Sequence, residues 1–244
     1  MRILVVADVH ANLAALQAVL AEAGEFETLW SLGDVVGYGA EPGACIELLR
    51  RYPLVAVAGN HDLAAVGAIG LEEFNPFAAE AARWTATQLS AAEKAWLSEL
   101  PQVAAEGQFT LVHGSLMDPA WGYLFEAAQA EEHLRRQTTS YGLVGHTHVP
   151  AVFFEAKGAY LEDGASPSAL LRTGLALAER RFVANAGGVG QPRDGDPRAA
   201  YAVLDTEARR MEFRRAAYDI ETTQAKIRAA GLPAYLAERL ARGR

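Results

Sequence analysis

The chain opens with the stretch MRILVVADVHANL, residues 1–13, and this stretch decides the fold class. Residues 3–7 form an unbroken apolar run that ends at Asp8, which is typical of a strand buried on both faces. Apolar residues then recur at helical spacing over 13–20, and Gly24 predicts the end of this helix. A buried strand followed at once by an amphipathic helix indicates an α/β fold.

The alternation of strand and helix continues along the first half of the chain. We predict a second strand over residues 28–32, a second helix over 43–51 and a third strand over 54–58. Strands separated by helices pair in parallel, because the helix carries the chain back to the same end of the sheet. In such sheets, functional groups gather at the carboxyl ends of the strands.

The next part of the chain predicts helices and then mostly strands. Residues 74–100 are typical of two helices, and Ser90 with Glu93 forms a capping box at the start of the second. The strands predicted after these helices are Phe109–Val112, Tyr141–Val144, Ala151–Phe154, 181–184, 201–204 and 210–214.

The remaining segments bear on domain organisation. Residues 163–170, DGASPSAL, predict a loop, and residues 219–244 predict two helices separated at Gly231 and Pro233. The sequence has no internal repeat, no low-complexity tract and no linker rich in Pro, Gly or Ser. We therefore expect residues 1–244 to form a single layered domain, with the C-terminal helices packed on it or extending from it.

Composition and charge exclude several classes of protein. Hydrophobic residues make up 51% of the 244 residues and charged residues 21%, which is typical of a folded chain. The formal net charge of −8 argues against general nucleic-acid binding, because such binding needs a basic face. Cys45 is the single cysteine, so an internal disulfide and a cysteine-based zinc site are excluded. The first apolar run is too short for a signal peptide or a membrane span, so we expect a cytoplasmic protein without a membrane partner.

Acidic and histidine residues gather at the ends of five predicted strands. Five of the six histidines lie there, and the exception, His133, falls in the polar helical stretch EEHLRRQ, where we expect it to be solvated. The motifs DVH, GD, GNHD, VHG and GHTH supply Asp8, His10, Asp34, Asn60, His61, His113, His146 and His148. So many polar residues at one buried rim predict a metal site, since burying them without partners would be costly.

The ligand chemistry indicates two transition-metal ions. Asp8 and His10 are two residues apart, so on an extended segment they point to the same side and can reach one metal together. The same would hold for His146 and His148. Mixed oxygen and nitrogen ligands favour Mn, Fe, Zn, Co or Ni over Ca or Mg. Seven candidate ligands are too many for one ion, whereas two ions about 3.5–4 Å apart that share a carboxylate would use them all.

In this order and at these positions, the motifs resemble those of the metallophosphoesterase, or calcineurin-like phosphoesterase, superfamily. The resemblance covers residues 1 to about 205. LGDVVGYG around Asp34, and the segment from Asn185 to Asp205, are similar to a small bacterial branch related to phosphodiesterases and diadenosine tetraphosphatase. The resemblance implies a four-layer α/β/β/α sandwich with two mixed β-sheets.

The resemblance also implies a role for each candidate residue. The implied ligands are Asp8, His10 and His148 for one ion and Asn60, His113 and His146 for the other, with Asp34 bridging the pair. His61 would protonate the leaving alkoxide or steady the phosphoryl oxygens, and Asp62 would orient His61. A hydroxide bridging the ions would attack phosphorus in line. Manganese is the ion we expect, with Fe, Zn, Ni or Co as alternatives.

Two departures from the family pattern bear on the substrate. Phosphoprotein phosphatases carry an arginine soon after the bridging aspartate, whereas here Asp34 is followed by VVGYG. Arg193 or Arg198 could supply a substitute cation, or each could form a surface salt bridge. Ala11 stands where the family usually has glycine, and Asn12 remains available as a phosphate contact or a helix cap.

Three aromatic residues lie near the predicted ligands. Trp121 and Tyr123 follow His113, and Tyr38 follows Asp34; each either packs at the edge of the core or walls a substrate pocket. We expect a hydrolase of phosphodiesters or phosphomonoesters acting on a small phosphorylated substrate, with nucleotides as one candidate class. The alternatives are a Ser/Thr-type phosphoprotein phosphatase and a non-catalytic interaction scaffold, although a scaffold would be expected to have lost ligands or His61.

Overall fold

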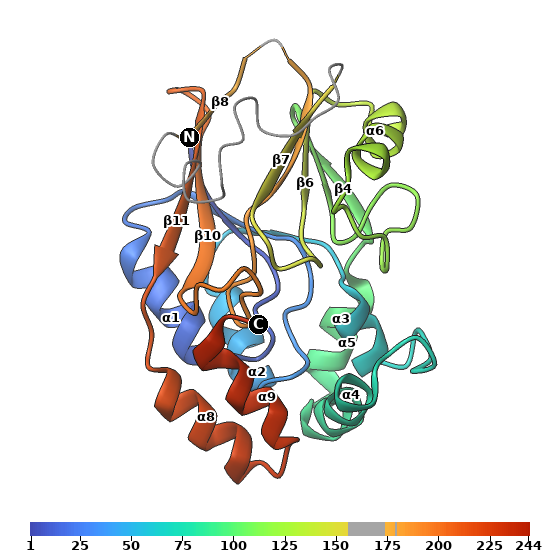
Figure 1. Ribbon diagram of the computed structural model, residues 1–244, viewed down its shortest axis with the longest axis vertical. Helices are drawn as coiled ribbons and strands as arrows, with labels where there is room; N and C mark the ends of the chain where they lie inside the picture. The colour runs from blue at the N-terminus through green and yellow to red at the C-terminus, as the bar shows by residue number, and fades with distance from the viewer. Residues whose placement is uncertain (156–173, 179) are drawn as a thin grey trace.

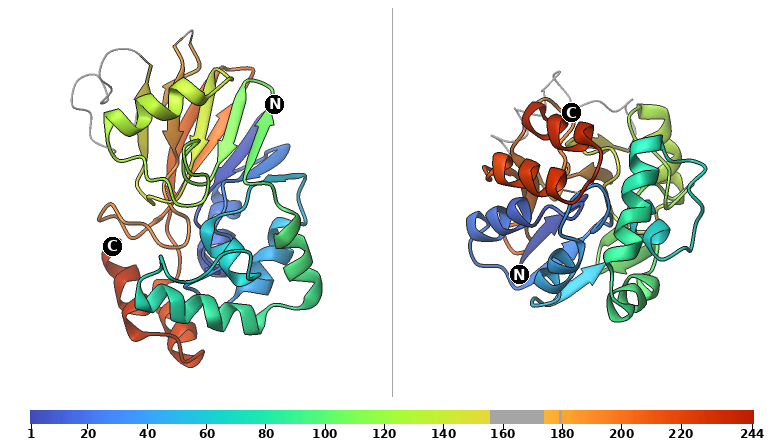
Figure 2. Two further views of the ribbon diagram at one scale, coloured as in Figure 1. Left: turned by 90° about the vertical axis from the view of Figure 1, so that its right-hand side faces the viewer. Right: turned by 90° about the horizontal axis from the view of Figure 1, so that it is seen from below.

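Two β-sheets facing each other form the centre of the molecule, and helices cover their outer faces (Figures 1 and 2). The computed structural model describes residues 1–155, 174–178 and 180–244 of the chain. The loop predicted over residues 163–170 lies outside these described residues.

The larger sheet has six strands in the described part of the chain. In spatial order they are β3 (Leu54–Ala56), β2 (Thr28–Ser31), β1 (Arg2–Val6), β10 (Ala199–Asp205), β11 (Arg210–Ala216) and β8 (Leu175–Ala176). Strands β1, β2 and β3 run parallel, as the sequence predicts, whereas β10 runs antiparallel to both β1 and β11. Strand β1 therefore lies between β2, its near neighbour in sequence, and β10, which comes almost 200 residues later.

The smaller sheet has five strands over the same described ranges. In spatial order they are β4 (Val103–Glu106), β5 (Phe109–Val112), β6 (Tyr141–Val144), β9 (Phe182–Asn185) and β7 (Ala151–Phe154). Strands β5, β6 and β9 run parallel, and the two edge strands β4 and β7 run antiparallel to their neighbours. Both sheets are thus mixed.

The apolar run at the start of the chain is buried on both sides because alternate residues face different layers. Ile3 and Val5 pack between the two sheets with Phe109, Leu143 and other residues of the smaller sheet. Leu4 and Val6 point to the opposite face and pack under helices. A strand that packs against apolar groups on both faces has no solvent-facing polar residues, which explains why the run is apolar throughout.

Helices complete a four-layer α/β/β/α sandwich, which confirms the fold class. Helices α1 (Leu13–Glu22) and α2 (Pro42–Leu49) cover the larger sheet, where Leu16, Val19 and Ile46 join its outward-facing residues. Helix α6 (Ala127–Arg136) covers the smaller sheet through Ala130 and Leu134. Each outer layer therefore has its own apolar core beside the one between the sheets.

The remaining helices lie at the end of the molecule where α1 and α2 begin (Figure 1). They are α3 (Asn60–Ala65), α4 (Pro76–Gln88), α5 (Ala91–Glu99), α8 (Ile220–Ala229), α9 (Ala234–Glu238) and the 3-10 helix η1 (Arg239–Arg242). The predicted capping box of Ser90 and Glu93 is present at the start of α5. The C-terminal helices pack around Tyr38 and against Ala78 and Ala81 of α4. No helix in the described residues is both long and apolar enough to span a bilayer.

One prediction about α6 is wrong. His133 is fully buried, and its Nδ1 accepts a hydrogen bond of 3.2 Å from the backbone N–H of Leu116. The charged neighbours of His133 suggested a solvated position, but His133 shares the inward face of α6 with Ala130, Leu134 and, just beyond the helix, Gln137. These four positions follow the i, i+3, i+4, i+7 spacing of a buried helical stripe.

Candidate metal centre

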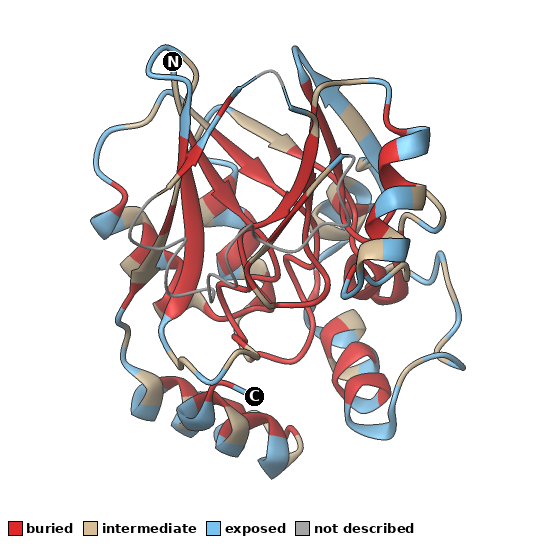
Figure 3. Cartoon of the chain, turned by 45° about the horizontal axis from the view of Figure 1, so that its top comes forward, coloured by how far each residue is buried: buried red, intermediate tan, exposed pale blue. Residues whose placement is uncertain are grey.

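The loops that leave the carboxyl ends of the parallel strands converge below the two sheets, where they are buried (Figure 3). Every residue predicted as a ligand is at most 4% exposed, and so is His61. The loops are joined by backbone hydrogen bonds, including Asp8 N–H to Gly33 O at 3.0 Å and His10 N–H to Asp34 O at 2.9 Å. The structure therefore brings residues from five separate strand ends into one buried site.

The backbone at this site adopts an unusual conformation. Eight non-glycine residues in the described ranges have positive φ, a region that side chains other than glycine rarely occupy. Seven of them lie in the converging loops: Asp8, His10, Ala11, Asp34, Tyr38, His146 and His148. Left-handed backbone at non-glycine residues clusters at functional sites, because the surrounding structure must hold it in place.

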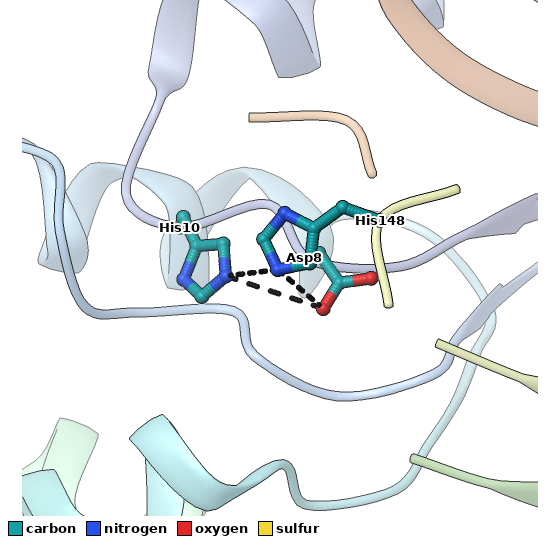
Figure 4. A group of neighbouring side chains, drawn as sticks. All are labelled: Asp8, His10 and His148. Carbon is teal, nitrogen blue, oxygen red and sulfur yellow. Dashed lines mark hydrogen bonds and ion pairs between the residues drawn. The ribbon is translucent and has the colours of Figure 1, made fainter. Parts of the chain in front are cut away.

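The first cluster of candidate ligands contains Asp8, His10 and His148, whose side chains point toward one another (Figure 4). His10 Nε2 lies 3.2 Å from His148 Nε2, and Asp8 Oδ1 lies 3.3 Å from the same His148 nitrogen. The distance from Asp8 Oδ1 to His10 Nε2 is 4.0 Å. Three possible metal-ligand atoms, from the loops that follow β1 and β6, therefore lie around one point.

The second cluster contains Asp34, His113 and His146, with Asn60 beside them. His113 Nε2 lies 3.1 Å from His146 Nδ1 and 3.2 Å from Asn60 Oδ1. Asp34 Oδ2 lies 3.3 Å from His113 Nε2 and 3.6 Å from His10 Nε2 of the first cluster. Asp34 therefore stands between the two clusters.

The positions of His146 and His148 differ from the prediction made from their spacing. Spacing alone suggested that both reach the same metal, provided that the segment is extended. Both residues have left-handed backbone, with φ of 64° and 59°, and their rings point into different clusters. The division implied by the family resemblance, with one histidine in each cluster, matches the observed arrangement.

The tautomers of three histidines indicate what the site holds. The Nδ1 atoms of His10, His113 and His148 each lie 2.5–3.1 Å from a backbone carbonyl oxygen, of Val36, Leu32 and Gln191 respectively. A nitrogen beside a carbonyl carries a proton, so in the neutral form of each ring Nε2 presents a lone pair. The Nε2 atoms of His10 and His148 lie 3.2 Å apart, and their lone pairs consequently point toward each other. A metal cation placed between such atoms would make this arrangement favourable.

Unpartnered polar atoms also fit a cation. Asp8 Oδ2 and His146 Nε2 are buried and have no hydrogen-bond partner among the described residues. Burial is the largest cause that raises the pKa of the Asp8 carboxyl to about 7 and lowers the pKa of the His146 imidazole to about 3. A nearby dication would offset the burial of Asp8 by favouring its carboxylate form.

Comparison with known proteins places the chain in a family. The model of the calcineurin-like phosphoesterase superfamily domain matches residues 1–209. The chain belongs to the calcineurin-like phosphoesterase superfamily.

The similarity to relatives extends over the whole chain. A crystal structure described as a metallophosphoesterase from Sphaerobacter thermophilus is 43% identical, has a TM-score of 0.88 and aligns over 100% of this chain and 99% of its own. An uncharacterized protein of Methanocaldococcus jannaschii is 34% identical over 99% of this chain and 98% of its own length. A hypothetical protein of Pyrococcus horikoshii, 19% identical with a TM-score of 0.80 over 100% of this chain and 98% of its own, shares the fold.

His61 lies beside both clusters. Its backbone N–H donates to Asp34 Oδ1 at 2.8 Å, and its Nδ1 is buried without a hydrogen-bond partner in the described ranges. The predicted orienting contact from Asp62 is wrong, since the Asp62 carboxylate accepts instead from the backbone N–H groups of Val36 and Gly59. Asp62 therefore ties the loops after β2 and β3 together.

A small pocket of about 70 Å³ opens at the two clusters. Its lining combines candidate ligands with aromatic and polar residues: Asp34, Tyr38, Asn60, His61, Glu73, Phe74, Asn75, Ala78, Trp121, Tyr123, His146, His148 and Arg193. Tyr38, Trp121 and Tyr123 thus wall the pocket, as one of the two interpretations of the sequence predicted. Phe74 and Asn75 were not predicted from the sequence as pocket residues. Asn75 caps α4, and the Asn75-Pro76 pair is the sequence signal that could have located this helix start.

The structure separates the predicted substrate contacts. Arg193 reaches the pocket, where its guanidinium lies 5.9 Å from the Tyr38 ring centre and its Nε has no hydrogen-bond partner within the described residues. Arg198 is away from the residues that line the pocket and forms the alternative salt bridge, with Asp196. Asn12 caps α1, because its side-chain oxygen accepts a hydrogen bond from Ala15 N–H at 3.1 Å. The prediction that Asn12 is a helix cap is confirmed.

Proposed function

We propose that this chain is a dinuclear-metal phosphoesterase that hydrolyses phosphodiester or phosphomonoester bonds of a small phosphorylated substrate. The position of Asp34 carries the proposal, because its Oδ2 lies 3.6 Å from His10 Nε2 of one cluster and 3.3 Å from His113 Nε2 of the other. A carboxylate between two sets of imidazole lone pairs is suited to holding two ions together.

The proposed ligand sets follow the two clusters. We assign Asp8, His10 and His148 to one ion and Asn60, His113 and His146 to the other, with Asp34 shared by both. The mixture of carboxylate, amide and imidazole donors supports manganese, with Fe, Zn, Ni or Co as alternatives. When bound, such ions lower the pKa of a coordinated water and withdraw charge from phosphoryl oxygens.

The other residues of the pocket act on the substrate. Arg193 has a buried, unpartnered Nε and replaces the arginine that phosphoprotein phosphatases carry after the bridging aspartate, so we propose that it binds a phosphate oxygen. His61 has a ring nitrogen without a partner and lines the same pocket, so we propose that it donates a proton or hydrogen bond to the leaving oxygen.

A substrate panel with a variant of Asp34 tests the proposal. Manganese-loaded protein is assayed against aryl phosphomonoesters, aryl phosphodiesters, cyclic nucleotides, dinucleoside polyphosphates and phosphopeptides, and metal content is measured on the same samples. Asp34→Asn keeps the shape of the side chain but removes its charge, so we expect loss of at least one ion per chain and a fall in turnover of about 1000-fold or more.

The control is Asp219→Asn, because Asp219 caps α8 at the surface and asparagine caps helices equally well. This variant should keep metal content and turnover. Retention of two ions and full turnover by Asp34→Asn would remove the bridging role. A parent protein that retains no transition metal and hydrolyses none of the panel would instead support the interaction scaffold.

A further inference from the structure

Gln191 lies in the connection between β9 and β10 and contacts both the first cluster and Arg193. It is 2% exposed, and its backbone carbonyl oxygen lies 2.5 Å from Nδ1 of His148. Its side-chain Oε1 accepts a hydrogen bond of 3.1 Å from Nη2 of Arg193. Gln191 does not line the pocket, so any effect that it has on a substrate must pass through one of these two neighbours.

The main chain at Gln191 is held by contacts that do not involve its side chain. The N–H of the preceding residue, Gly190, donates to Asp8 O at 2.8 Å. The two loops approach so closely here that a Cβ atom on Gly190 would lie 1.9 Å from Val9 O, a clash that only glycine avoids. A change in the Gln191 side chain should therefore leave its carbonyl oxygen beside His148.

The Arg193 guanidinium keeps its full charge at the pocket. Its acceptor on Gln191 is a neutral amide, its Nε has no hydrogen-bond partner, and it forms no ion pair with a carboxylate among the described residues. Burial is the largest cause that raises the pKa of the nearby Tyr38 and Tyr123 phenols, and the guanidinium offsets this rise only in part, so both phenols are neutral at neutral pH. A neutral acceptor orients a cation without cancelling its charge, whereas a carboxylate in the same place would form an ion pair.

We propose that Gln191 is a positioning residue, whose amide oxygen fixes the Arg193 guanidinium at the pocket and leaves its positive charge for a phosphate oxygen. The inference rests on the proposed function, because it takes Arg193 as the phosphate contact. The same residue holds His148 through its main chain, so it sets the position of the guanidinium relative to the first cluster. A phosphate oxygen then meets an arginine that is already in place, which avoids the cost of ordering a flexible side chain on binding.

Two variants of Gln191 separate positioning from a purely structural role. Gln191→Met keeps the length of the side chain and removes the acceptor, so we expect KM for the aryl phosphate esters to rise about 3- to 10-fold, the range of one hydrogen bond. The kcat and the metal content should not change. Gln191→Glu keeps the acceptor and adds a charge that pairs with Arg193 and repels phosphate, so KM should rise further. A purely structural role predicts the reverse order, because glutamate is the closer match in shape.

Two further measurements connect the effect to Arg193. In an Arg193→Met background, Gln191→Met should cause no additional rise in KM, because the two residues act through one contact. Nitrogen NMR of zinc-loaded protein labelled at arginine gives a readout that does not depend on turnover, with the Arg193 signal assigned by its loss in Arg193→Met. Rotation about its Nε–Cζ bond should be slow in the parent protein and in Gln191→Glu, and fast in Gln191→Met.

The matched control is Gln137→Met, because Gln137 is 3% exposed and does not line the pocket. This variant should keep the KM of the parent protein and the slow rotation at Arg193.

The outcomes separate the positioning role from the proposed function. Equal rotation rates or equal KM values in the parent protein and Gln191→Met overturn the positioning role, even if every ester is hydrolysed. Slow rotation that becomes fast in Gln191→Met supports the contact with Arg193. If the metal-loaded parent protein then hydrolyses no ester and binds no inorganic phosphate in calorimetric titration, that result counts against the phosphoesterase proposal alone.

Discussion

His61 differs from the neighbouring histidines in how its ring is held. The Nδ1 atoms of His10, His113 and His148 are each beside a backbone carbonyl, which fixes the tautomer and aims Nε2 at the site. His61 Nδ1 has no such partner among the described residues, and the ring is held instead by contacts with aromatic neighbours, including Tyr38 at 4.3 Å. Packing, and not a hydrogen bond at Nδ1, therefore orients this ring.

Replacing His61 should separate catalysis from metal binding. We expect His61→Ala to keep both ions, because its ring is not in either proposed ligand set, and to lose about 100- to 10,000-fold in kcat, the usual contribution of a positioned acid. Metal analysis and steady-state kinetics on the same preparation check this. If His61 protonates the leaving group, the loss should be smaller for 4-nitrophenyl esters, whose leaving group needs no proton, than for alkyl esters.

The control for this prediction is His133→Asn, which removes a buried histidine that does not line the pocket. It should leave kcat unchanged for both classes of ester. Equal kcat values in His61→Ala and the parent protein would contradict the assigned role.

His133 should make stability depend on pH. Burial lowers the pKa of His133 to about 4, from 6.5 in an unfolded chain. Below pH 6.5 the unfolded chain binds the proton more readily, so stability falls as pH drops from 6.5 toward 4 and does not fall further for this reason below 4. The difference in pKa corresponds to about 3 kcal/mol at most.

A comparison of variants isolates this effect. In His133→Asn the side-chain oxygen can still accept from Leu116 N–H, but nothing titrates. Urea unfolding at pH 7 and pH 4.5 should show the parent protein losing about 2 kcal/mol more than the variant. Parallel pH profiles for the two proteins would show that His133 is not held neutral in the fold.

At the residue scale, the sequence predicted which side chains meet but not how they are aimed. Motifs at strand ends were enough to bring Asp8, Asp34 and His113 to one rim, because parallel strands end at the same edge of a sheet. The direction of each side chain depended on left-handed backbone at His146 and His148, which simple spacing does not encode. The partners of Asp62 and the burial of His133 depend in the same way on tertiary contacts.

The connection between β9 and β10 is the element that places Arg193. It is held on one side by β11, where the buried Arg215 forms an ion pair with Asp194 and donates to Arg198 O at 3.1 Å. On the other side it meets the C-terminal end of the chain, where Gly195 N–H donates to Gly243 O at 2.9 Å. An ion pair at the residue next to Arg193 therefore fixes the backbone from which Arg193 reaches the pocket.

Breaking this ion pair should weaken substrate binding before it affects chemistry. We expect Arg215→Met to lose about 3–5 kcal/mol of stability, since it leaves the Asp194 carboxylate buried without its partner. In the folded fraction we expect KM to rise about 10-fold, because one contact between Arg193 and the phosphate is lost. The kcat and the metal content should change little. Arg215→Lys keeps the charge and should recover part of the loss in KM.

Arg214→Met provides the matched control on the same strand. Arg214 pairs with Glu212 at the protein surface, so KM should stay at the parent value in this variant. A loss of kcat in Arg215→Met with unchanged KM would contradict a positioning role for Arg215.

At the element scale, long and strongly apolar segments were predicted and short or exposed ones were not. The sequence predicted the strands of the parallel core, since each has the continuous apolar run of a buried strand. It missed β4, whose first residue, Val103, is 41% exposed, and β8, which has two residues. Helix α3 was also missed, because its six residues Asn60–Ala65 overlap the GNHD motif and carry site residues instead of an apolar stripe.

At the scale of the whole molecule, the two clusters oppose folding unless cations bind. Buried imidazole lone pairs and carboxylates face one another in them, so ions that bind the folded protein and not the unfolded chain should stabilise the fold. Each ion at about 100 times its dissociation constant contributes about 2.7 kcal/mol, so two ions contribute about 5 kcal/mol, which corresponds to about 10–20 °C in Tm for a chain of this size.

Metal removal tests this coupling. We expect a strong chelator, which removes both ions, to lower Tm by about 10–20 °C and added manganese to restore it in a concentration-dependent way. Differential scanning calorimetry on dialysed samples measures both. The shift should be smaller in Asp34→Asn, which has lost the shared carboxylate. An identical Tm with and without chelator in the parent protein would contradict a metal centre built into the fold.

The pairing of β1 with β10 has a consequence for synthesis on the ribosome. The first strand can join β2 early, but its other edge stays open until residues 199–205 have left the exit tunnel. Asp8 and His10 follow that strand, and His148 completes their cluster much later in the chain. A nascent chain that lacks residues 199–205 consequently exposes an unpaired strand edge, and one that lacks His148 also has an incomplete set of ligands. Newly made chains should depend on chaperone protection until β10 pairs, and should acquire metal only once His148 has emerged.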